Sequence, residues 1–218
     1  MAVKLKRKPK GTYHHPDLQG ALVEAALQTI RKTGVDSLTL RDVGLRLGVS
    51  RTALYRHFKD KSALLARLAL EGFRVFHQTL QSAVDQAHTN KKDPLEEMGV
   101  AYVNFAMANQ SHYKTMFSDA ICTWGDYPDL ALEADGAFAV LVNTIAAEQC
   151  AGRIIAEDPA RLAQVIWAGV HGLATLGMAG HLGTHNDIIH LARHQCHTLF
   201  TGLRPTPRNT TRRAKSAS

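Results

Sequence analysis

The sequence predicts an all-α protein. Strict apolar–polar alternation, which is typical of strands, is scarce, whereas Ala, Leu, Gln and Arg are abundant across the 218 residues. Apolar residues instead recur at helical spacing between turn signals, which indicates about nine helices. A chain of this length can bury one substantial core and a small second unit. We therefore expect a three-helix unit over residues 16–62 and a helical bundle over residues 63–203, flanked by basic disordered segments over 1–15 and 204–218.

The net charge of +7 is unevenly distributed along the chain. Residues 1–11 and 204–218 each hold five basic residues and no acidic one, and residues 12–66 hold eight basic and five acidic residues. Residues 67–203 reverse the balance, with eight basic and fourteen acidic residues. Basic charge thus gathers on the N-terminal unit and the two tails, where we expect a polyanion to bind. The acidic body argues against DNA wrapping around the whole molecule.

The first helix is expected to run from Pro16 and Asp17 to Lys32 and to end at Gly34. The basic segment before it has two interpretations. It is either a solubilising tail or an arm whose lysines neutralise phosphates beside a DNA groove.

Two short helices follow, joined by a tight turn. Thr39 is a good N-cap that Asp42 can answer, and Gly48 supplies the backbone freedom to end the first of these helices. Ser50 then caps a second helix over residues 51–57. A short helix, a glycine turn and a second helix form the DNA-binding helix-turn-helix arrangement, in which the second helix enters the major groove.

The composition of this second helix suits contact with DNA. Leu54 and Phe58 lie four residues apart and can face the core, which leaves donor side chains on the other faces. Arginine can pair with guanine edges or phosphates, and hydroxyl groups with phosphates. The residues expected at DNA are Thr39, Arg41, Ser50, Arg51, Thr52, Ala53, Tyr55, Arg56, His57 and Lys61, with Lys8 and Lys10 from the arm.

This stretch also resembles the signature of the tetracycline-repressor (TetR/AcrR) family. One departure is Gly44, where the family usually has alanine. The resemblance implies a homodimeric transcriptional regulator, most often a repressor, that a small molecule releases from a palindromic operator. It also implies that the fourth helix, which Asp60 should cap and which should extend to about His88, joins the DNA-reading unit to the ligand-binding body. The matching residues are Ser50, Arg51, Ala53, Leu54, Tyr55, His57, Phe58, Lys61 and Leu64.

The body should continue with helices over about 95–110, 112–119 and 129–149, with a loop over 123–128. Its aromatic and methionine side chains either form a core or line a ligand cavity, because both use the same residue types. The candidate ligand-binding residues are Phe105, Met116, Trp124, Phe138, Trp167, His171 and Met178.

The next helix, expected over about 158–180, carries several glycines on one face. Glycine lowers helix stability, so a close packing partner is the expected benefit, and dimerisation is the natural use. The predicted dimer face is Gly169, Gly172, Leu173, Leu176, Gly177 and Gly180, with Leu199 from the last helix. Trp167, His171 and Gly172 also resemble the C-terminal domain of the WHG subgroup of the family. His171 is then either a hydrogen-bonded core histidine or a pocket residue.

Two other functions remain as alternatives. The last helix, over about 186–203, places His190, His194 and His197 at i, i+4 and i+7, which could bind a metal with His181 or His185. No carboxylate or cysteine completes a known motif, and such a stripe is usually solvated. An enzyme using His171 as a base would need a positioned acid or nucleophile, and none lies at helical spacing. We therefore expect no cofactor and no catalysis.

The remaining composition points to the cytoplasm. No apolar run approaches the roughly 18 residues of a membrane span, and the basic N-terminus lacks the apolar core of a secretory signal. The three cysteines, Cys122, Cys150 and Cys196, are expected to be core residues, because an odd number argues against a disulfide framework. A thiol switch would lack any CxxC spacing.

Overall fold

The structure, a computed structural model, describes residues 17–121 and 124–204. Across these residues it is all-helical, with nine α-helices and one 3-10 helix, which confirms the predicted fold class. The helices are α1 (Leu18–Thr33), α2 (Leu40–Leu47), α3 (Arg51–His57), α4 (Lys61–Thr89), α5 (Pro94–Ala108), α6 (Gln110–Met116), η1 (Trp124–Asp126), α7 (Pro128–Cys150), α8 (Pro159–Met178) and α9 (His185–Gly202).

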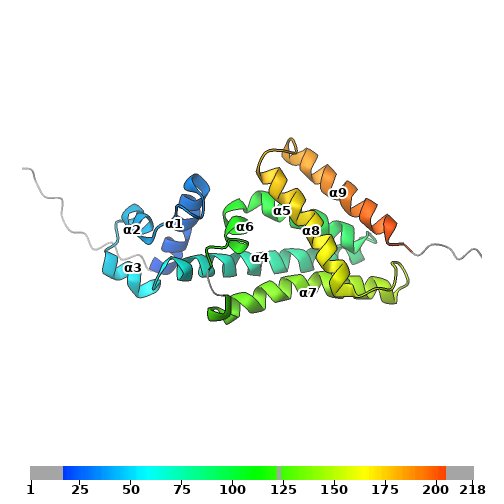
Figure 1. Cartoon of the computed structure of the whole chain (residues 1–218), viewed down its shortest axis with the longest axis horizontal. Helices are drawn as coiled ribbons and strands as arrows, with labels where there is room; N and C mark the ends of the chain where they lie inside the picture. Colours follow the sequence, from blue (N-terminus) through cyan, green and yellow to red (C-terminus); the bar gives the residue numbers. More distant parts are fainter. Residues whose placement is uncertain (1–16, 122–123, 205–218) are drawn as a thin grey trace, which may run out of the picture.

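Helix α4 connects the two ends of the molecule. Helices α1, α2 and α3 gather around its N-terminal end, and the remainder of α4 runs through the body (Figure 1). Helix α7 packs along α4, and α5 packs against α4, α8 and α9. The short helix α6 contacts both α4 and α1. Helix α4 and helix α6 therefore both join the N-terminal helices to the body.

The two short helices begin and end where the sequence predicts. The Thr39 hydroxyl accepts a hydrogen bond from the Asp42 amide at 3.1 Å, and the Ser50 hydroxyl accepts one from the Ala53 amide at 3.2 Å. Gly48 adopts a left-handed conformation with φ of 67°, which a side chain would disfavour. A Cβ on Gly44 would meet Leu54 Cδ1 at 3.1 Å, so the glycine allows α3 to approach α2 closely.

Packing between α4 and α6 depends on a small residue on α4. A Cβ added to Gly72 would lie 2.7 Å from Met116 Sδ and 3.2 Å from His112 Cβ. A larger residue would therefore require the Met116 side chain to shift or α6 to move away from α4. The close approach of α6 to α4 places Tyr113, which lies between His112 and Met116 in the sequence, in the interior of the body.

Some predicted features differ from the structure. Helix α6 ends at Met116 rather than at about residue 119, and the predicted loop contains the 3-10 helix. Cys196 is buried as expected, but Cys150 ends α7 and is exposed, so its prediction as a core residue is wrong. Cys122 lies outside the described residues, as do the basic segments over 1–15 and 205–218.

One helix among the described residues, α7, is long and apolar enough by length and composition to cross a membrane. In this structure α7 packs against α4 and α8 instead. It also carries Glu133, Asp135 and Glu148 along its length. Length and composition alone do not separate a membrane span from a core helix.

Candidate functional site

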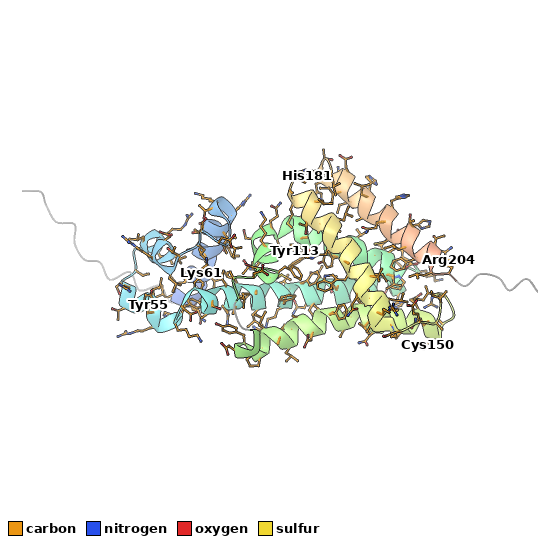
Figure 2. The ribbon with its side chains drawn as sticks, viewed as in Figure 1. Tyr55, Lys61, Tyr113, Cys150, His181 and Arg204 are labelled. Carbon is orange, nitrogen blue, oxygen red and sulfur yellow. The ribbon has the colours of Figure 1, made fainter. Side chains whose placement is uncertain are left out.

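Helix α3 presents polar side chains at one end of the molecule. The Leu54 side chain of α3 is buried in the core and holds the helix in place, so α3 has one inward face. Tyr55 is 45% exposed, and Figure 2 shows it at the same end as Lys61. Ala53 is half-buried, whereas the exposed side chains of α3 are Arg51, Thr52, Tyr55, Arg56 and His57.

Neighbouring contacts position some of these groups. The Arg51 guanidinium lies over the Tyr55 ring, 5.4 Å from its centroid, as expected for residues four apart on a helix. Lys61 is half-buried and donates a hydrogen bond to the Asp36 carbonyl at 2.7 Å, which holds its ammonium group in place and leaves two N–H donors for a phosphate. Thr39 and Arg41 are exposed at the start of α2. Lys8 and Lys10 lie outside the described residues.

A cavity of about 300 Å³ lies in the body between α4, α5, α7 and α8. We call it the α4–α8 cavity. Its walls are mostly aromatic and aliphatic, with a few polar groups, which is the usual composition of a small-molecule site. The lining residues are Phe73, Phe76, Leu80, Leu95, Met98, Gly99, Tyr102, Phe117, Ala134, Asp135, Ala137, Phe138, Leu141, Gln164, Ile166, Trp167 and Val170.

Two of the candidate ligand-binding residues, Phe138 and Trp167, line this cavity. Four others do not. Phe105 packs its ring against Phe76 with centroids 5.0 Å apart, and Met116 lies against Gly72. Met178 is half-buried at the C-terminal end of α8, and His171 contacts the lining residues Tyr102 and Trp167 without lining the cavity itself.

The side chain of the remaining candidate, Trp124, is outside the described part of the chain. Sequence reasoning also missed lining residues such as Tyr102, Phe117, Asp135 and Gln164. Apolar periodicity marks the inward face of each helix, but it does not say which inward residues meet a void rather than another side chain.

A hydrogen-bonded cluster forms part of the cavity wall. The Trp167 indole N–H donates to the Tyr102 hydroxyl at 3.1 Å, and the Tyr102 and Tyr113 hydroxyls are 2.9 Å apart. His171 Nδ1 lies 3.0 Å from the Tyr102 hydroxyl and 2.8 Å from the Tyr113 hydroxyl. With Nδ1 as acceptor, donors run in series from Trp167 through Tyr102 and Tyr113 to His171. His171 is therefore a hydrogen-bonded histidine next to the cavity, which is the first of its two predicted interpretations.

All titratable members of this cluster are neutral near pH 7. Burial lowers the pKa of His171 below its ordinary value. Burial also raises the pKa of Tyr102 to about 12, and burial together with the neighbouring Tyr102 raises the pKa of Tyr113. A neutral imidazole can accept a hydrogen bond from a phenol, so the protonation states and the geometry agree.

The lowered pKa of His171 predicts a pH-dependent stability. As the pH falls below about 6.5, the unfolded chain takes up the proton before the folded protein does, so the free energy of unfolding falls. The loss is at most about 1.4 kcal/mol per pH unit for one histidine. His112 on α6 should add to it, because burial lowers its pKa too, although Glu71 and Glu24 oppose that shift. Urea unfolding between about pH 8 and about pH 5 measures the slope.

The variant His171→Asn provides the comparison, because it keeps a polar group near Nδ1 that does not titrate. We expect its free energy of unfolding to depend less steeply on pH than that of the parent protein, while a residual slope from His112 remains. An equal or steeper slope in the variant would show that His171 does not resist protonation in the folded protein.

Part of the predicted dimer face on α8 contacts α9 of the same chain, and the face as a whole stays a prediction. A Cβ on Gly177 would meet Ile188 Cδ1 at 3.0 Å, and one on Gly169 would meet Gln195 Nε2 at 2.5 Å. Both partners belong to α9 of the same chain, so these glycines allow α9 to pack closely. Leu173 is half-buried against the core, and Gly180 lies beyond the end of α8.

A different face of α8 is open. Gly172 has nothing within 4 Å of an added Cβ, and Leu176 is 48% exposed. Val165 on the same face and Leu191 on α9 are also exposed. Leu199, predicted for the dimer, is half-buried on α9. We call the exposed apolar surface of Val165, Gly172, Leu176 and Leu191 the α8–α9 face.

The histidines of α9 do not form a metal site within the described residues, where no group of three or more His, Cys, Asp or Glu side chains could hold an ion. His190, His194 and His197 are all exposed. Glu96 lies 3.8 Å from His197, but Arg193 also binds it at 2.6 Å and binds Glu97 at 2.9 Å.

The structure combines a helix-turn-helix, whose second helix exposes basic and aromatic side chains, with a helical bundle that contains an apolar cavity. A long helix joins the two parts. This combination is typical of DNA-binding proteins with a separate helical body. Residues 22–68 match the bacterial regulatory proteins of the tetR family, and residues 95–199 match the tetracyclin repressor-like C-terminal domain.

Individual relatives agree with this match. The class A tetracycline repressor of Escherichia coli is 50% identical over 48 residues, which span only 22% of each chain. The transcriptional regulator TtgR of Pseudomonas putida is 27% identical over 170 residues, which span 72% of this chain and 78% of TtgR. A solved Rhodococcus protein of unknown function is 30% identical, with a TM-score of 0.75, over 90% of this chain and 100% of that one.

The chain belongs to the TetR family, whose members are transcriptional regulators rather than enzymes. The family expected from residues 50–64 is thereby confirmed. The narrower resemblance to the WHG subgroup stays a prediction.

Proposed function

We propose that the chain is a homodimeric transcriptional repressor of the cytoplasm, released from a palindromic operator by a small-molecule effector. The observation that carries the proposal is the placement of the exposed face of α3 and the α4–α8 cavity along one helix, α4. Helix α3 exposes Arg51, Tyr55 and Arg56 at one end of α4, and the α4–α8 cavity is lined by Phe73, Phe76 and Leu80 further along the same helix. We propose that residues 16–62 read DNA and residues 63–203 bind the effector and the partner subunit.

We propose α4 and α6 as the route of coupling. Tyr113 of α6 belongs to the hydrogen-bonded cluster at the cavity wall, while α6 also contacts α1. The seam between α1 and α6 holds a polar cavity of about 320 Å³, so these helices are not tightly packed along their whole contact. An effector switches the protein only if it binds the DNA-incompetent arrangement more tightly than the competent one.

Selection of bound fragments from a pool of random duplexes tests the DNA-binding proposal without knowledge of the operator. The purified protein should enrich sequences with two related half-sites in inverted orientation, about one helical turn apart or a multiple of it. Enrichment of a single, unrepeated site would contradict the dimeric reading of DNA. Retention of all sequences alike would leave only electrostatic, non-specific binding.

The α8–α9 face predicts where the dimer forms. Leu176→Glu places a charge on an apolar surface that should be buried by the partner, so we expect it to weaken dimerisation by at least about tenfold. Leu132→Glu is the matched control, because Leu132 on α7 is even more exposed, at 72%, yet lies outside this face. Analytical ultracentrifugation over a range of concentrations compares the two. A control variant that dissociates as readily as Leu176→Glu would place the interface elsewhere.

A metal-responsive regulator was the alternative predicted from the sequence. Its proposed ligands are exposed, and the described residues form no group that could hold an ion, so we favour an organic effector. Addition of Zn²⁺ or a chelator should leave operator affinity unchanged.

A further inference from the structure

We infer that the α4–α8 cavity takes an apolar cation, such as an organic ammonium with a small apolar body. The inference rests on the proposed function, in which this cavity holds the effector. It follows from the charges, the aromatic rings and the mouth of the cavity.

The charge of the lining residues argues against anionic effectors. Among the described lining residues there is one charged side chain, Asp135, and no lysine, arginine or histidine. A carboxylate or phosphate held there would lose its water without gaining a positive partner, and burial of an unpaired charge is costly. It would also be repelled by Asp135. A positively charged group would instead be attracted by the Asp135 carboxylate.

We call the exposed edge of the cavity, formed by Asp135, Phe138, Gln164 and Trp167, its mouth. It combines a carboxylate with aromatic rings. Asp135 and Phe138 are three residues apart on α7, and Gln164 and Trp167 are three residues apart on α8, so each pair shares a helix face. The Phe138 and Trp167 rings meet edge to face with centroids 5.8 Å apart. Asp135 and Gln164 are exposed, as is part of Trp167.

Both mouth groups are available to a cation. The indole of Trp167 is oriented by its hydrogen bond to Tyr102, which fixes the ring at the cavity wall. No ion pair within the described residues engages Asp135. A cation in the mouth can therefore lie near the carboxylate and against an aromatic face, the two strongest partners a protein offers an organic ammonium.

The interior limits the body of the ligand. Phe73, Phe76 and Phe117 line it together with aliphatic side chains, so the buried part of the ligand should be apolar. The volume of about 300 Å³ is at the lower end of known ligand pockets. A compact aromatic or branched alkyl body fits these limits better than a long acyl chain.

Three probes with the same compact phenylpropyl body test the charge preference, because they end in trimethylammonium, hydroxyl or carboxylate. Binding is measured by fluorescence of Trp167 in a Trp124→Phe background, which leaves Trp167 as the single tryptophan of the chain. Isothermal titration calorimetry repeats the measurement on the parent protein. We expect the ammonium probe to bind about tenfold or more tighter than the carboxylate probe, with the hydroxyl probe between them.

Asp135→Asn tests the residue. It removes the charge with little change of shape, so it should reduce the affinity for the ammonium probe several-fold and leave that for the hydroxyl probe unchanged. Asp129→Asn is the control, since Asp129 is an exposed acid in the first turn of the same helix and does not line the cavity. The control should retain the preference for the ammonium probe.

The outcomes separate this inference from the proposed function. Equal or tighter binding of the carboxylate probe, or an unchanged preference in Asp135→Asn, would overturn the cation site while leaving an effector cavity in place. Binding of the ammonium probe that leaves the selected DNA fragments bound would support the cation site but count against its role as the effector site. If none of the probes bound, the cation site would be wrong, while the proposed function would still stand or fall on the selection of DNA fragments.

Discussion

Replacement of Arg56 by alanine is expected to weaken operator binding by about 10- to 100-fold, without loss of the fold or the dimer. Arg56 is exposed in the last turn of α3 and has no role in the buried face of that helix, which Leu54 provides. Its loss therefore removes contacts with DNA and little else. Electrophoretic mobility shift with the selected fragment gives the affinity, and circular dichroism verifies the helical content.

The salt dependence of the variant distinguishes the type of contact. If Arg56 reads a base, Arg56→Ala should bind mutated half-sites almost as well as the original one, with an unchanged salt slope. If it binds a phosphate, affinity should fall for all sequences, and the slope of log affinity against log salt should decrease by about one. Tyr55→Ala should also weaken binding, and it additionally removes the ring below Arg51.

Lys92→Ala is a suitable charge control. Lys92 lies just after the C-terminal end of α4, at the opposite end of that helix from α3, and its ammonium group is 3.4 Å from Glu97. The substitution removes one positive charge from the protein without touching the DNA-reading end. Parent-like operator affinity in both Arg56→Ala and Tyr55→Ala would show that α3 is not the recognition helix.

The DNA-reading end was predictable because its signals are local. Thr39, Gly48 and Ser50 act within three or four residues of their own position, and the structure shows the corresponding caps and turn. The spacing of Leu54 and Phe58 likewise identifies the buried side of α3, which leaves its other side to solvent. Short-range chemistry of this kind can be read directly from a sequence.

The cavity and the α8 faces were harder to predict because they depend on contacts between distant segments. A helical wheel places Gly169 and Gly177 beside Gly172, yet the packing of α9 covers the first two and leaves the third open. Tyr102 and Tyr113 carry no local signal of their pairing with His171, which is 69 and 58 residues away in the chain. Only the arrangement of α5, α6 and α8 brings the three together.

This cluster leads to the second large effect, a non-additive loss of stability. Tyr102→Phe and Tyr113→Phe should each cost about 1 kcal/mol, because in either variant the other hydroxyl still contacts His171 Nδ1, at 2.8 Å or 3.0 Å. The double variant leaves Nδ1 with neither phenol. It should therefore lose about 1–2 kcal/mol more than the two single variants together. Urea unfolding of the four proteins at about pH 8, where His171 is neutral, completes the cycle.

Tyr127→Phe serves as the control for removal of a phenol. Its hydroxyl is half-buried and makes only a long hydrogen bond of 3.4 Å to Ser62, so its loss should change the free energy of unfolding by less than about 0.5 kcal/mol. Strictly additive losses in the double variant would mean that the two phenols do not share His171 as a partner. A non-additive loss would instead tie α5, α6 and α8 into one unit. Movement of α6, which contacts α1, would then require a change at the cavity wall.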